Sequence, residues 1–61
     1  MTQREILEWA VYGAYTSWRE ADNYKRKHPE DEFGINAEKM RKETLMELDK
    51  LLQEESMRSA I

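Results

Sequence analysis

The sequence predicts an all-α protein, a two-helix antiparallel hairpin in which the 61 residues form a single helical-hairpin domain. Glycine and proline occur only at Gly13, Pro29 and Gly34, and the last two lie close together in mid-chain. The segments on either side are rich in helix formers and would be roughly 37 Å and 31 Å long, so they could lie side by side. We therefore expect helices at about residues 3–27 and 37–57, joined by a nine-residue connection.

The first helix has clear signals at both ends. Thr2 followed by Glu5 matches the capping box, in which side chains satisfy the free backbone N–H groups of a helix start. The basic run at residues 25–28 suits the negative end of the helix dipole, and Pro29 cannot continue the helix. The residues expected to face the second helix are Leu7, Ala10, Val11, Ala14, Trp18 and Ala21.

The second helix is expected to start after Asn36, a favourable N-cap residue. Ile35 and Met40 then occupy the two positions of a hydrophobic staple. Phe33 and Ile35 are large apolar residues in an otherwise polar connection, so we expect them to fold back and plug the open end of the hairpin. The apolar stripe of this helix is Met40, Thr44, Leu45, Leu48, Leu51 and Leu52, flanked by Ala37.

The first helix carries more apolar surface than this single stripe can cover. Ile6, Trp9 and Tyr24 extend its apolar sector to one side, and Gly13 with Ser17 would let another helix approach closely. Because small helical scaffolds without a disulfide or a metal are marginally stable, we predict a homodimer, in the form of an antiparallel four-helix bundle. Docking on a different protein is the alternative. The predicted interface residues are Ile6, Trp9, Tyr12, Gly13, Tyr15, Trp18, Tyr24, Leu45, Leu48 and Leu52.

Few residues in the chain are suited to catalysis. It has no cysteine, so disulfides and thiolate metal sites are excluded, and its one histidine, His28, lies in a helix-ending segment. The acidic run at residues 30–32 lacks the spaced oxygen ligands of a calcium loop, and no glycine-rich phosphate loop is present. We expect no enzymatic activity, no cofactor and no metal.

The charges give no strong preference for nucleic acid or membranes. Lys and Arg total 10 and Asp and Glu total 13, a net charge of −3, and the basic run at residues 25–28 is followed at once by three acids. No apolar run approaches the ~18 residues of a membrane span, and residues 1–5 lack the pattern of a secretory signal. We expect a cytoplasmic protein without a membrane partner.

One short stretch resembles a known family. Glu47-Leu48-Asp49 is similar to the end of the Ser-Gln-Glu-Leu-Asp signature in the small two-helix aspartyl-phosphate phosphatases of sporulating bacteria. Here Leu45-Met46 replaces the Ser-Gln pair. The resemblance covers fewer than ten residues and implies Glu47 and Asp49 as candidate site residues.

The residues taken together predict a small protein–protein interaction module, an adaptor, regulator or inhibitor that acts through self-association and an aromatic and leucine-rich helix face. Two alternatives remain open. One is a phosphatase-like regulator of a response-regulator pathway, and the other is a weak nucleic-acid-binding accessory protein.

Overall fold

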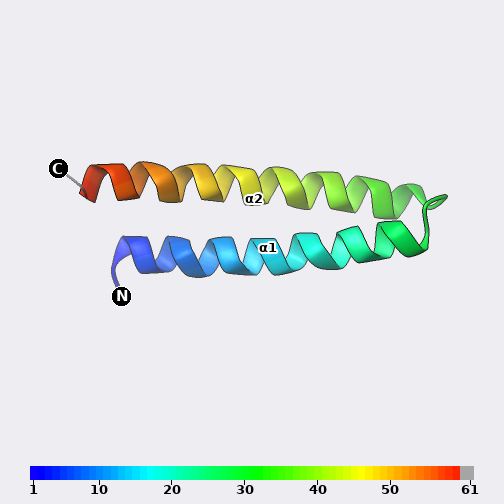
Figure 1. Ribbon diagram of the computed structural model, residues 1–61, viewed down its shortest axis with the longest axis horizontal. Coiled ribbons are helices and arrows are strands. Elements are labelled where there is room, and N and C mark those ends of the chain that lie inside the picture. Colours follow the sequence, from blue (N-terminus) through cyan, green and yellow to red (C-terminus); the bar gives the residue numbers. More distant parts are fainter. Residues whose placement is uncertain (60–61) are drawn as a thin grey trace.

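A computed structural model of the protein describes residues 1–59 and consists of two α-helices that lie side by side (Figure 1). Helix α1 spans Gln3–Lys27 and helix α2 spans Glu32–Ser59. The helices run antiparallel along an elongated body of 48 × 17 × 12 Å. The predicted all-α hairpin is confirmed.

Both ends of α1 lie where the sequence predicts them. The Thr2 hydroxyl accepts a hydrogen bond from the backbone N–H of Glu5 at 3.2 Å, and it donates to the Glu5 carboxylate at 3.2 Å. At the other end, the backbone N–H of His28 donates to the carbonyl of Tyr24 at 2.9 Å. Local capping signals therefore determine the bounds of this helix.

Helix α2 begins at Glu32, five residues earlier than predicted. Asp31 is its cap, because the Asp31 carboxylate accepts the backbone N–H of Phe33 at 2.9 Å. Asn36 is consequently an exposed residue inside the helix, and the connection has four residues, 28–31, instead of nine.

The predicted plug and staple are absent. Phe33 is 71% exposed, and Ile35 and Met40 are exposed as well. All three lie within α2, and the connection is too short for any of them to fold back over the end of the hairpin. The residue that is buried beside the connection is Gly34, which lies directly against the ring of Tyr24.

The seam between the helices is thin. Ala21 and Gly34 are the only buried residues among those that the structure describes. No large side chain in this part of the chain is fully buried. Two polar contacts link the helices near the connection: Lys25 Nζ lies 3.6 Å from the Glu38 carboxylate, and Arg41 donates to the Ser17 carbonyl at 3.1 Å. The half-buried apolar residues of the seam are Leu7, Ala10, Val11, Ala14, Trp18, Ala37, Leu45, Leu48 and Leu52.

Gly34 permits the close approach of the helices beside the connection. A Cβ at this position would lie 2.8 Å from Tyr24 Cδ1. We expect Gly34→Ala to destabilise the hairpin by about 1–2 kcal/mol, although alanine is the better helix former by about 1 kcal/mol. In a Tyr24→Ala background the same change should instead stabilise, and chemical denaturation of the four variants measures this reversal of sign. A destabilisation that persists without the ring would contradict the explanation.

Tyr24 also ties the connection to α1 through its hydroxyl group, which donates to the Asp31 carboxylate at 2.5 Å. This bond raises the pKa of the Tyr24 phenol. The same bond, with the N–H donated by Phe33, lowers the pKa of the Asp31 carboxyl. The ring of Tyr24 further contacts those of His28 and Phe33, with centroids 4.6 Å and 6.4 Å away.

These two shifts predict how stability depends on pH. A carboxyl with a lowered pKa stabilises the fold above its unfolded-state pKa, and its contribution is lost as the pH falls through the lowered value. A phenol with a raised pKa stabilises below its unfolded-state pKa and loses this contribution as the pH rises through the raised value. Thermal unfolding followed by circular dichroism should show both losses. Tyr24→Phe should abolish the alkaline loss and reduce the acidic one, and an unchanged pH profile would contradict the role of the bond.

Candidate protein–protein interface

The hairpin leaves an unusually large share of its apolar side chains in water. Trp9 is 65% exposed and Tyr12 66% exposed, and both Met40 and Met46 are more than half exposed. Many of these side chains gather on the two sides of the seam, whereas Trp9 lies on the outer side of α1. The large exposed apolar residues are Met1, Ile6, Trp9, Tyr12, Tyr15, Tyr24, Phe33, Ile35, Met40, Met46, Leu51 and Met57.

One side of the seam carries a continuous surface that we call the apolar face. Its residues fall within an arc of about 60° on each helix when they are placed at 100° per residue. Hollows that bridge the helices connect Tyr24 with Phe33 near the connection and Leu7 with Leu51 near the other end. The apolar face comprises Ile6, Ala10, Gly13, Ser17 and Tyr24 of α1 with Phe33, Ala37, Met40, Thr44 and Leu51 of α2.

The middle of the apolar face is lined by small side chains. Ala10, Gly13 and Ser17 follow one another along α1, and a Cβ at Gly13 would meet no atom within 4 Å. Charged residues border the apolar face at both ends. Glu20 and Arg41 lie beside Tyr24, and the hollow at Leu51 is also lined by Glu54, Glu55 and Arg58. A surface with small residues at its centre and larger apolar residues at both ends is suited to close packing against other helices.

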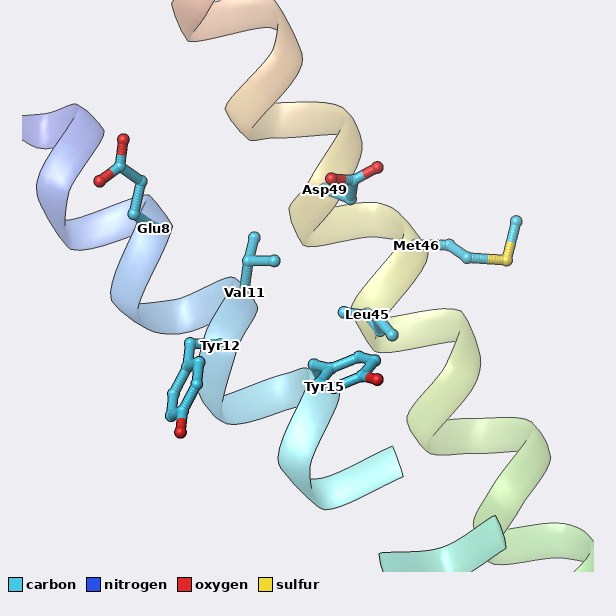
Figure 2. Close-up of a pocket in the computed structure, with 7 residues that line it drawn as sticks. All are labelled: Glu8, Val11, Tyr12, Tyr15, Leu45, Met46 and Asp49. Atoms are coloured by element: carbon cyan, nitrogen blue, oxygen red, sulfur yellow. The ribbon is translucent and has the colours of Figure 1, made fainter. Parts of the chain in front are cut away.

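The opposite side of the seam carries a hollow of about 510 Å³, which we call the tyrosine groove. Val11 and Leu45 form its floor, and Tyr15 reaches across towards Leu45 at one end (Figure 2). Glu8 of α1 and Asp49 of α2 lie at the other end. The groove is therefore apolar along its length and acidic at one end. The residues that line it are Glu8, Val11, Tyr12, Tyr15, Leu45, Met46 and Asp49.

The charges around the tyrosine groove are only partly paired. Glu8 accepts from Arg4 at 3.2 Å, whereas Asp49 accepts from the neutral amide of Gln53 at 3.1 Å. At the other end, the guanidinium of Arg19 lies 5.9 Å from the centre of the Tyr15 ring. The groove thus runs from two carboxylates to a cation.

The ten residues predicted as one interface belong to different surfaces. Helix α2 occupies the middle of the apolar sector of α1, so the residues on the two sides of that sector face in opposite directions. Trp9 lies on the outer side of α1, with its ring at right angles to that of Tyr12 and 6.3 Å away. Ile6, Gly13 and Tyr24 lie on the apolar face, Tyr12, Tyr15 and Leu45 line the tyrosine groove, and Trp18, Leu48 and Leu52 lie in the seam.

Sequence reasoning missed part of both surfaces. Phe33 was expected inside the connection, and instead it extends the apolar face at one end. Met46 points away from the leucine stripe, yet it lines the tyrosine groove together with Asp49, one helical turn further on. The three-residue spacing of Met46 and Asp49 indicates that they share one side of the second helix. It does not show that Tyr12 and Tyr15 of the first helix lie on that side.

The residues considered for other chemistry do not form a site. Glu47 and Asp49 are two positions apart on α2, so they point about 160° apart around the helix. Residues 1–59 contain no group of three or more His, Cys, Asp or Glu side chains that could hold a metal ion. Within the same residues, neither helix combines the length and hydropathy that crossing a membrane requires.

Comparison with known proteins gives no assignment: no family model, curated protein sequence or solved structure matches this chain. The two exposed surfaces are therefore the observations on which a function must rest.

Proposed function

We propose that this protein is a small interaction module, an adaptor, regulator or inhibitor, that pairs with a second copy of itself through the apolar face. In this arrangement two hairpins stack face to face as an antiparallel four-helix bundle, and their apolar faces become its core. The observation that carries the proposal is the near absence of a core in the single hairpin. Ala21 is its one buried apolar side chain among residues 1–59.

The exposed area of the chain supports the proposal quantitatively. The single hairpin exposes 5030 Å². A compact globular protein of 7.4 kDa exposes about 4,200 Å², so the excess is about 800 Å². A stable interface of ordinary size buries about 800 Å² on each partner. The excess arises because the body is only 12 Å thick, and a second layer of helices would remove it.

The apolar face suits a second copy better than the tyrosine groove does. It runs nearly the whole length of the hairpin, from Ile6 and Leu51 at one end to Tyr24 and Phe33 at the other. Its central small residues would allow the helix axes of two hairpins to approach closely, while Met40 of each copy would fill space at their crossing. The charged residues at the ends of the apolar face are of both signs, whereas those that line the tyrosine groove are two carboxylates, which are costly to bury without cationic partners.

Light scattering coupled to size-exclusion chromatography tests the proposal directly. At tens of micromolar the protein should elute with the mass of two chains. Its melting temperature should rise with protein concentration, because association stabilises the folded state by mass action. A single species with the mass of one chain, and a melting temperature independent of concentration, would refute self-association.

A further inference from the structure

We propose that the tyrosine groove is a second, separate binding surface, which takes an amphipathic helical segment of another protein with lysine or arginine beside its apolar face. The groove lies on the side of the hairpin opposite to the apolar face, so both surfaces could be occupied at once. The inference is therefore independent of self-association. It would make the module an adaptor that joins a basic partner to a dimer.

The shape of the groove favours a helix. Its floor is formed by Val11 of α1 and Leu45 of α2, and the groove is open to solvent between these two antiparallel helices (Figure 2). A third helix laid in such a depression between two others buries one of its faces, as amphipathic helices do in the grooves of their partner proteins. Tyrosine and methionine, which border the groove at Tyr12, Tyr15 and Met46, are enriched in protein interfaces.

The charges decide the chemistry and the orientation of the partner. Glu8 and Asp49 project from different helices at the same end of the groove, and Asp49 has no cationic partner among the described residues. A lysine or arginine of the partner at this end could pair with Asp49, and the negative charge of Glu8 would add to the attraction. Arg19 already lies over Tyr15 at the other end, so a basic residue there would be repelled. The partner should therefore carry its positive charge at one end of its buried stretch.

The phenol groups add hydrogen-bonding capacity at the rim. Neither the Tyr12 nor the Tyr15 hydroxyl has a hydrogen-bond partner within residues 1–59, although both rings border the groove. Tyrosine combines a large apolar ring with a polar tip, so these two side chains could cover the apolar face of a partner helix and bond to its polar groups.

A pair of synthetic peptides tests the proposal. Each has about 14 residues with leucine along one helical face and neutral polar residues elsewhere, except at two positions beside the leucine face at one end, which are lysine in one peptide and glutamate in the other. Calorimetric titration of the full chain at physiological salt should show saturable binding of the lysine peptide, with a dissociation constant of roughly 10–100 μM. The glutamate peptide should not bind. Equal binding of the two peptides, or binding of neither, would overturn the proposal.

Matched variants separate the groove from general attraction to an acidic protein. Glu8→Gln with Asp49→Asn should weaken binding roughly five- to tenfold. Glu43→Gln with Glu47→Gln changes the net charge equally outside the groove and should have little effect. Met46→Ala should likewise weaken binding severalfold.

The exposed Met57 supplies the apolar control, since Met57→Ala should leave binding unchanged. Equal losses in the groove and control variants would show that the peptide is held by net charge or by undirected apolar contact, and this would overturn the proposal. The mass of each variant is measured alongside by light scattering. A change of oligomeric state in the Glu8 and Asp49 variant would assign the groove to self-association, which is also an overturning result.

Discussion

Replacing Trp18 by alanine should remove a large part of the stability of the folded hairpin. Trp18 is the largest side chain of the seam, and it packs beside Tyr15 with ring centroids 6.0 Å apart. Removing a large aromatic from a packed position costs about 3–5 kcal/mol when it is fully buried, so about 2–3 kcal/mol is expected for this half-buried ring. A chain of 61 residues has a total stability of only roughly 3–9 kcal/mol. Loss of helical signal in circular dichroism and a large fall in the denaturation midpoint measure the effect.

Two further variants make this prediction specific to the seam. Trp9→Ala removes the same side chain from an exposed position on the same helix, and it should change the stability of the single hairpin by less than about 0.5 kcal/mol. Trp18→Phe should be much milder than Trp18→Ala. The buried Nε1 of Trp18 has no hydrogen-bond acceptor within residues 1–59, so phenylalanine removes an unsatisfied donor while keeping an aromatic ring. Equal losses for Trp9→Ala and Trp18→Ala would contradict the assigned seam.

The sequence signals for α1 were sufficient because they are local. Thr2, Glu5 and Pro29 act within a few residues of the helix ends, and the periodic apolar positions give the side that α2 covers. No information from the rest of the fold is needed to interpret them. The stripe predicted for the second helix was only partly right. Ala37, Leu45, Leu48 and Leu52 are half-buried in the seam, whereas Met40, Thr44 and Leu51 are exposed.

The start of α2 was predicted five residues too late. The Asp31 cap is a local signal, but the acceptance of Gly34 inside the helix depends on a tertiary contact. Gly34 is a helix breaker by propensity, and this made Asn36 the more attractive cap. In the folded hairpin, Gly34 lies inside the helix, at a position where only a residue without a side chain fits against the Tyr24 ring. The Asp31 cap is reinforced by the hydroxyl of that same tyrosine. Both effects depend on residues that are seven or more positions away in the chain.

Sequence reasoning also did not predict that the exposed residues divide into two separate surfaces. A helical projection already separates Ile6 from Tyr15 on α1, but the predicted stripe of α2 included exposed residues, so it did not show which residues of α2 adjoin each flank. The way in which the helices pack decides that Tyr24 meets Phe33 on one side while Tyr15 meets Leu45 on the other. A single predicted interface therefore combined residues that face in opposite directions.

Replacing Ile6 by glutamate should convert the proposed dimer into a monomer with little loss of helix. Ile6 is 54% exposed in the single hairpin, so a carboxylate there would remain in water, and the cost to the monomer would be small. Between two apolar faces the same carboxylate would be buried without a cation, at a cost of several kcal/mol for each copy. We expect association to weaken by at least about 100-fold, measured by sedimentation or light scattering over a concentration series.

Met46→Glu is the matched control for this prediction. Met46 is 62% exposed and also lies on the surface of a helix, but it borders the tyrosine groove on the opposite side of the hairpin. Met46→Glu introduces the same charge as Ile6→Glu. It should leave the dimer intact, because the new carboxylate stays in water in both the monomer and the dimer. If Met46→Glu separates the copies while Ile6→Glu does not, self-association uses the groove side of the hairpin. The apolar face would then be the surface left free for another protein.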